Sequence, residues 1–254
     1  TDPNSIQGNA ISCIEGDYKN NLWIGTTAGP VVFNAERSSF TPLKYFGMDK
    51  KAKQLKITAY EIIAVHSQNI ILVATKEAIV LYKEGEQIGT AIPFNGKLNY
   101  IARSISYDAK KKIFYVFITG SGLCQYDIKS NKITLLNNTI TVANCIKLTN
   151  EGLWIGSDEG AYLYNPGLNT YSKNQFSEKT SVRDFFQQDN RLWIATDGAG
   201  VYTITKNQST PVLYRASGPV ALLKSKSLYD IFESKNGEIW FGTLRGGVSM
   251  MGKK

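Results

Sequence analysis

The sequence has few of the residues that most often carry chemistry. It contains one histidine, His66, and three cysteines, Cys13, Cys124 and Cys145, with no C-x-x-C pair among them. A Ser–His–Asp or Cys–His site would have to include His66, which lies beside a turn in "IAVHSQN" with no partner evident in the sequence. The cysteines fit neither a zinc site nor a dense disulfide framework. We therefore expect no catalytic residue, no metal and no cofactor, and thiols that behave as small buried hydrophobes.

Long apolar runs and a charged-then-apolar leader are also missing, so the sequence predicts neither a membrane-spanning helix nor a signal segment. The 14 tyrosines and 11 phenylalanines outnumber the 3 methionines, a balance that favours strands over helical bundles.

Basic residues exceed acidic ones by 29 to 21, giving a formal charge of +8. They gather in "MDKKAKQLK" (48–56), "DAKKKIF" (108–114), "LKSKS" (223–227) and the final "GKK". None of these runs interleaves aromatic residues with arginine, as a nucleic-acid platform would. We expect solvated turns and chain ends, with an anion-binding surface as the alternative, and no nucleic-acid partner.

What the sequence does contain is a repeat. Six strings align on one column: "LWIGTTAGPVVFN" (22–34), "ILVATKEAIVLYK" (71–83), "YVFITGSGLCQYD" (115–127), "LWIGSDEGAYLYN" (153–165), "LWIATDGAGVYTI" (192–204) and "IWFGTLRGGVSMM" (239–251). The spacing is near 40 residues. Each unit reads as an apolar run, a polar turn, the tryptophan run, a glycine-bearing turn and an alternating run. A weaker fourth run appears in some units, at 38–46, 132–138 and 210–216.

Short strands joined by hairpin turns and repeated at this period predict an all-β fold, a β-propeller of six blades within one domain, residues 1–254. A β-sandwich would have a similar number of strands without the recurrence. The expected blade cores are 11–34, 57–83, 101–127, 142–165, 182–204 and 228–251. The repeated string is accordingly interpreted as the residues that pack the blades together rather than as a catalytic signature.

"NLWIGT", "GLWIGS", "RLWIAT" and "EIWFGT", each followed by a turn with glycine, resemble the two-component regulator propeller repeat. The opening "DPNSIQGNAISCIEGDYKNNLWIGT" is especially similar to the family pattern. The resemblance extends over all six copies. It is weaker in the second and third, where Leu72 and Val116 replace tryptophan.

The resemblance implies the periplasmic sensor region of an inner-membrane hybrid two-component protein of Bacteroides-type bacteria, responding to oligosaccharides from complex glycans. It also implies a homodimer in the full-length receptor, with the membrane segment, histidine kinase and regulator domains outside this chain. Family members usually build seven-bladed propellers, so this chain is either a six-bladed ring or part of a larger, seven-bladed one. A protein–protein interaction scaffold and a propeller-type glycan hydrolase or lyase are the alternatives.

The best indication of a ligand site lies at the start of the first strand in each repeat. Equivalent positions of successive blades surround a propeller's central channel, where polar groups beside tyrosine and arginine fit a sugar-binding mouth. The same residues can instead tie neighbouring blades together by hydrogen bonds. The acidic ones, Glu61, Asp184 and Asp230, can also be read as the paired carboxylates of a glycosidase. The residues predicted to bind ligand are Arg103, Arg183, Asp184, Tyr229 and Asp230.

Overall fold

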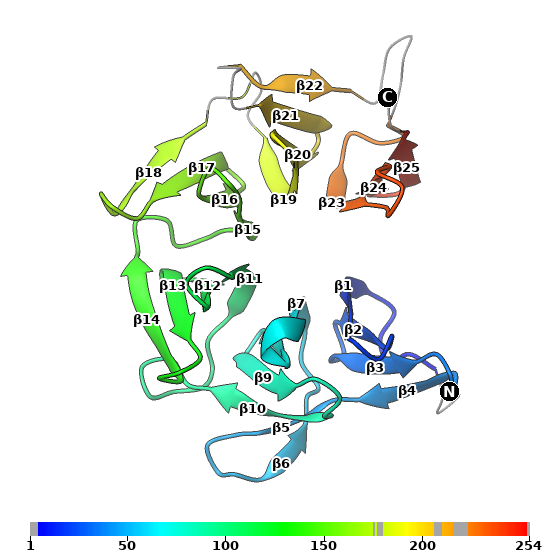
Figure 1. Cartoon of the computed structure of the whole chain (residues 1–254), viewed down its shortest axis with the longest axis vertical. Helices are drawn as coiled ribbons and strands as arrows, with labels where there is room; N and C mark the ends of the chain where they lie inside the picture. The colour runs from blue at the N-terminus through cyan, green and yellow to red at the C-terminus, as the bar shows by residue number, and fades with distance from the viewer. Residues whose placement is uncertain (1–4, 175, 177–179, 206–209, 216–222, 253–254) are drawn as a thin grey trace. The chain divides into compact units, whose positions relative to one another are not determined.

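A computed structural model describes residues 5–174, 176, 180–205, 210–215 and 223–252. The regular secondary structure of the described residues is strand, apart from the 3-10 turn η1 (His66–Gln68). No helix in this part of the chain combines the length and hydrophobicity that crossing a bilayer requires. The strands form six sheets, numbered here as blades 1 to 6 in chain order (Figure 1), so the predicted all-β propeller class is confirmed. The blades fall into two compact units, Thr1–Thr141 and Val142–Lys254.

Unit 1 contains blades 1 to 3. Blade 1 is an antiparallel sheet of β1 (Ile11–Gly16), β2 (Leu22–Thr26), β3 (Val31–Asn34) and β4 (Ser39–Pro42). Blade 2 is formed by β7 (Ala59–Val65), β8 (Ile70–Thr75), β9 (Ile79–Lys83) and β10 (Ile88–Ile92), extended by β5 (Lys44–Phe46) and β6 (Ala52–Gln54). Blade 3 has β11 (Ala102–Asp108), β12 (Ile113–Ile118), β13 (Gly122–Asp127) and β14 (Lys132–Asn137).

Unit 2 contains blades 4 to 6. Blade 4 has β15 (Cys145–Leu148), β16 (Leu153–Ser157), β17 (Gly160–Asn165) and β18 (Thr170–Lys173). Blade 5 has β19 (Ser181–Gln188), β20 (Arg191–Asp197), β21 (Val201–Thr205) and β22 (Val212–Tyr214). Blade 6 has three strands among the described residues, β23 (Leu228–Glu233), β24 (Ile239–Thr243) and β25 (Gly247–Met251).

The repeated tryptophan forms the junction between successive blades. Trp23 of blade 1 meets Tyr82 of blade 2 edge-to-face, with ring centroids 5.2 Å apart. In unit 2, the ring of Trp193 in blade 5 lies 5.8 Å from that of Phe241 in blade 6. Both tryptophans are 1% exposed. Large aromatic side chains buried in this way supply much of the packing energy of a small sheet, which explains why the string recurs.

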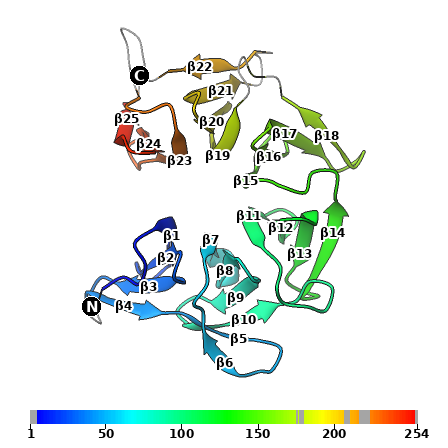
Figure 2. The same ribbon diagram turned by 180° about the vertical axis from the view of Figure 1, so that it is seen from behind.

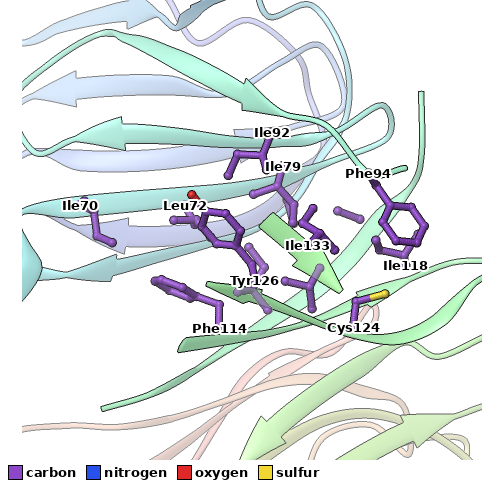
Figure 3. Packing of buried hydrophobic residues seen from close by; sticks show 14 of the residues in the cluster. Ile70, Leu72, Ile79, Ile92, Phe94, Phe114, Ile118, Cys124, Tyr126 and Ile133 are labelled. Atoms are coloured by element: carbon purple, nitrogen blue, oxygen red, sulfur yellow. The ribbon is translucent and has the colours of Figure 1, made fainter. Parts of the chain in front are cut away.

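The junction between blades 2 and 3 is built without tryptophan. Leu72 takes the tryptophan position of blade 2 and is fully buried in one cluster with Phe114 and Tyr126 of blade 3 (Figure 3). Aliphatic side chains therefore fill the gap that an indole fills elsewhere, and the weaker second repeat is still a complete blade.

Two glycines of the repeated string leave room for sulfur. A Cβ on Gly25 would lie 2.4 Å from Sγ of Cys13, and one on Gly156 would lie 2.6 Å from Sγ of Cys145. Larger residues at these glycines would collide with the neighbouring strand. The expectation of three buried thiols is wrong for two of them: Cys124 is buried, whereas Cys13 and Cys145 are only partly buried. Each lies near the exposed start of a first strand.

The fourth strand expected at 38–46 is divided between two blades. Residues 39–42 complete blade 1 as β4, and the chain then crosses to blade 2 through the buried Leu43. There β5 pairs in parallel with β10, and β6 adds to β5 at the outer edge of the sheet (Figures 1 and 2). The lysine run at 48–56 is therefore not only a turn, because it includes β6. The other expected fourth runs correspond to β14 and β22.

Candidate functional site

In five of the six blades, a β-bulge at the start of the first strand leaves one residue out of the pairing with the second strand. The register skips one residue between β1 and β2, β7 and β8, β11 and β12, β19 and β20, and β23 and β24. Bulges re-aim side chains and are common beside binding sites. The skipped residues are Ser12, Tyr60, Arg103, Arg183 and Tyr229.

In unit 2 the bulge residues of blades 5 and 6 come together. The guanidinium carbon of Arg183 lies 5.3 Å from the ring centroid of Tyr229, a cation–π arrangement. Both side chains also contact one carboxylate, because Arg183 Nη2 lies 3.0 Å from Asp197 Oδ2 and the Tyr229 hydroxyl donates to the same oxygen at 3.0 Å. Asp197 ends β20, directly before the glycine-bearing turn of blade 5.

Blade 4 contributes a second carboxylate on the other side of Arg183. Asp158 lies in the turn between β16 and β17, with Oδ1 3.8 Å from Arg183 Nη1. That oxygen accepts hydrogen bonds from Ser181 Oγ at 2.6 Å and Asn144 Nδ2 at 2.9 Å. Ser227 adds a hydrogen bond to Asp197. The seven polar residues from blades 4, 5 and 6 are called the Arg183 cluster: Asn144, Asp158, Ser181, Arg183, Asp197, Ser227 and Tyr229.

The electrostatics of the Arg183 cluster keep both carboxylates ionised. Hydrogen bonds from Ser181 and then Asn144 lower the pKa of Asp158. The hydrogen bond from Ser227 is the leading cause that lowers the pKa of Asp197, aided by Tyr229 and Arg183. Desolvation, followed by the hydrogen bond to Asp197, raises the pKa of the Tyr229 hydroxyl, which stays a neutral donor. The cluster thus combines fixed acceptors, a cation and an exposed aromatic ring.

One atom of the Arg183 cluster has unused hydrogen-bonding capacity. Nε of Arg183 is buried and has no hydrogen-bond partner among the described residues. A buried donor left without an acceptor costs free energy, so such an atom calls for an explanation.

In unit 1 the bulge residues of blades 2 and 3 form a similar pair. The guanidinium carbon of Arg103 lies 4.6 Å from the ring centroid of Tyr60. An arginine stacked on a tyrosine of a neighbouring blade therefore occurs in each unit at the same strand position. Arg103 belongs to unit 1, whereas the other four predicted ligand residues belong to unit 2.

The acidic residues that follow the bulge positions hold blades together. Glu61 Oε2 accepts hydrogen bonds from Ser104 Oγ and the backbone N–H of Ile105 in the next blade, both at 2.6 Å. Asp184 Oδ2 accepts the backbone N–H of Ile231 in the next blade at 2.9 Å. The inter-blade network that the sequence left open as an alternative therefore exists for Glu61 and Asp184.

Asp230 occupies the position of Asp184 one blade later and is exposed. Burial, followed by repulsion from Asp230, raises the pKa of Asp184 to about 8. Ligand binding by Asp184 and Asp230 stays a prediction.

The lone histidine follows the end of β7, whereas Tyr60 lies at the start of that strand. His66 Nδ1 contacts Glu84 Oε1 in blade 2, and the Glu84 side chain is almost wholly buried. Within the described chain, no group of three or more His, Cys, Asp or Glu side chains is arranged to hold a metal ion.

Sequence reasoning singled out Arg183 and Tyr229, which the structure brings into contact, but not Asp158 and Asp197. Both aspartates lie in or beside the second turn of the repeat, in "SDEG" and "TDGAG", which were interpreted only as glycine turns. A search for charged residues in that turn, facing the first strand of the same or the next blade, would have found them.

Comparison with solved structures gives the same fold. The chain matches the extracellular domain of the putative hybrid two component system BT3049 from B. thetaiotaomicron at 21% identity with a TM-score of 0.80, over 98% of this chain and 34% of that one. It matches the corresponding domain of BT4673 from B. thetaiotaomicron at 14% identity and a TM-score of 0.64, over 96% of this chain and 38% of that one. The chain thus spans little more than a third of these relatives.

A third match is a whole propeller domain, that of Myceliophteria thermophila Cps50 (Swd1), at 12% identity and a TM-score of 0.61, covering 98% of this chain and 99% of that one. At these identities the structural matches establish the fold alone. The search of curated proteins gives no match. The family description "Two component regulator propeller" matches residues 5–28 and 222–245, so the predicted resemblance is confirmed and the chain carries repeats of that family at its first and sixth blades.

Proposed function

We propose that this chain is the ligand-binding propeller of an extracytoplasmic sensor in a hybrid two-component signalling protein, located in the periplasm. The family repeats at residues 5–28 and 222–245 support the signalling role. Two structural relatives are extracellular domains of putative hybrid two component systems, which supports the location. The proposed receptor is a homodimer attached to the inner membrane through a segment outside this chain.

The proposed ligand is an oligosaccharide released from a complex glycan. The observation that carries this proposal is the Arg183 cluster, in which side chains of three consecutive blades converge at the strand starts. Sugars are recognised by fixed hydrogen-bond partners beside an aromatic face, and the cluster offers ionised carboxylates, an arginine and the half-exposed ring of Tyr229. Two adjacent hydroxyl groups of a sugar could then bind together, with the guanidinium donating hydrogen bonds and the carboxylates accepting them.

Calorimetric titration with a panel of plant and host glycan oligosaccharides tests the proposal. We expect one class of oligosaccharide to release heat, and Arg183→Met to weaken its binding at least about tenfold, equivalent to about 1.4 kcal/mol. Arg191→Met is the matched control, because it removes an exposed arginine of the same blade that is not part of the cluster. Absence of heat with every oligosaccharide, or equal affinity of the two variants, would contradict the proposal.

One observation favours the alternative of a protein-interaction surface. One face of the blade 6 sheet exposes Phe232, Trp240, Val248 and Met250, and contiguous exposed apolar side chains mark contact surfaces. A ligand panel without heat, together with an apolar partner that covers Trp240 and quenches or shifts its fluorescence, would favour this alternative. A glycan hydrolase acting through Asp184 and Asp230 would lose turnover in Asp184→Ala and in Asp230→Ala.

A further inference from the structure

The hairpin formed by β5 and β6 is an addition to the blade pattern. Among the described residues, the sheets of unit 2 have three or four strands, whereas in blade 2 two more strands extend the sheet beyond β10. Figure 1 shows β5, β6 and the loop between them projecting at the outer edge of blade 2. Residues 44–56 are called the lysine hairpin. It takes no part in the Arg183 cluster or in the pairs between first strands.

The base of the lysine hairpin is held in blade 2 by buried side chains and backbone hydrogen bonds. Leu43, directly before the hairpin, and Leu55, near its end, are buried in the cluster that also holds Trp23 and Tyr82. The backbone N–H of Leu55 donates to the carbonyl of Leu43 at 2.9 Å, and that of Lys44 donates to Gln87 of blade 2 at 2.9 Å. The tip is therefore held at a fixed place on the blade by a buried anchor, as a presented surface would be.

The base of the hairpin is apolar and buried, whereas most of its other side chains are charged and exposed. Five lysines and one aspartate lie within residues 44–56, with no arginine. All five lysines are exposed, and Asp49 is paired with Lys53 at 2.7 Å. Between them, Met48 is 63% exposed, and Phe46 is exposed beside it. The hairpin thus exposes two apolar side chains and five ammonium groups.

We propose that the lysine hairpin docks the propeller on an anionic lipid bilayer surface. Charge complementarity points to a negatively charged partner, because net charge +4 of the chain's +8 falls in these residues. The lysines point to lipid rather than to a protein, since lysine is depleted and arginine enriched in protein interfaces. The exposed methionine and phenylalanine provide the apolar contact that an interfacial anchor inserts below the headgroups.

The docking is peripheral and reversible. A short two-stranded hairpin with one methionine at its tip buries little apolar surface, so the lysines supply most of the attraction. Each lysine near an anionic surface strengthens binding about fivefold, and the effect declines when salt screens the charges. The lysine hairpin shares no residue with the proposed oligosaccharide site, so either proposal can fail without the other.

Co-sedimentation of the full chain with unilamellar vesicles tests the inference. We expect binding to vesicles of phosphatidylglycerol and phosphatidylcholine in equal parts, weakening as sodium chloride is added, and none to pure phosphatidylcholine. Lys50→Glu/Lys51→Glu should lower the partition coefficient at least about 25-fold, the product of two lysines at about fivefold each. Met48→Asp should lower it about tenfold, because a charged tip cannot enter the interface.

Lys110→Glu/Lys112→Glu is the matched control, since it reverses the same number of exposed lysines in the turn between β11 and β12 of the same unit. Its partition coefficient should stay within about twofold of wild type. Equal losses in the two double variants would overturn the proposal, because binding would then follow net charge alone. Full binding by Met48→Asp would overturn the insertion of Met48 into the interface. Absence of binding to the phosphatidylglycerol vesicles would overturn the proposal in favour of a soluble polyanion or an acidic protein.

Discussion

Asp184 is the residue whose chemistry depends most on its blade neighbours. Its carboxylate bonds to Ile231 of blade 6, while burial and the nearby charge of Asp230 raise its pKa to about 8, partly opposed by Lys147. The folded chain therefore keeps a proton on Asp184 at pH values where the unfolded chain has released it. The neutral acid still accepts the bond from Ile231 through its carbonyl oxygen.

We expect the free energy of unfolding to fall as the pH rises from about 4 to about 8, the interval between the unfolded and folded pKa values of Asp184. Asp184→Asn keeps an acceptor for Ile231 and carries no charge, so it should lose most of this decline. Above pH 8 it should be more stable than wild type by on the order of 1–2 kcal/mol, a figure reduced for partial exposure. Urea unfolding across this pH range measures both chains.

Asp230→Asn is the companion variant. Removing its charge takes away one cause of the raised pKa and leaves burial, so the decline should be smaller than in wild type but still present. Identical pH slopes for wild type and Asp184→Asn would show that Asp184 is ionised in the folded chain throughout the range.

At the scale of the blade, the face of a sheet that carries the repeated tryptophan is buried by the first two strands of the next sheet. Phe186, Trp193, Ala195 and Val201 of blade 5 pack against Leu228, Ile231, Ile239 and Phe241 of blade 6. The corresponding side of blade 6, which Phe232 and Val248 share with Trp240, is open: Trp240 is 37% and Phe232 is 62% exposed. The same residue type in the same strand position thus has two different environments.

The two tryptophans form a matched pair for mutation. Trp193→Ala should cost about 3–5 kcal/mol, because it opens a cavity at a closed junction. Trp240→Ala should cost less, about 1–2 kcal/mol, because Trp240 is 37% exposed and less packing is lost with its ring. Urea denaturation followed by far-ultraviolet circular dichroism compares them. Should Trp193→Ala fail to fold, Trp193→Phe should still cost more than Trp240→Phe; equal costs within either pair would contradict the junction described here.

The sequence predicted blades well because each carries its own turn and packing signals. The tryptophan, the small residue two positions later and the glycine turn are local, so the fold class followed from them. The lysine hairpin was not predicted, because "KYFGMDKKAKQ" has little apolar alternation and owes its strands to pairing with β10 of another repeat. Arg183 and Tyr229 were found from blade equivalence. Asp158 and Asp197 were missed because a turn aspartate has common structural roles and only spatial proximity to Arg183 distinguishes it.

For the whole molecule, two surface properties act in opposite directions. The net charge of +8 makes copies of the chain repel one another, while the open face of blade 6 gives them an apolar surface to share. Repulsion between like-charged molecules extends over a Debye length and weakens as salt is added, whereas apolar contact does not. Salt should therefore strengthen self-association of the chain and weaken the vesicle binding proposed for the lysine hairpin.

We expect the isolated chain to self-associate with increasing concentration, and more so at high than at low salt, through the face that contains Trp240. Val248→Lys/Met250→Lys places two charges on that face and should keep the chain monomeric under the same conditions, with its vesicle binding unchanged or slightly stronger. Sedimentation velocity over a range of protein and salt concentrations measures the association. A wild-type chain that stays monomeric throughout would show that the blade 6 face is too small or too wet to bind a second copy. Association that weakens with salt would show instead that charge pairs, rather than apolar side chains, hold the copies together.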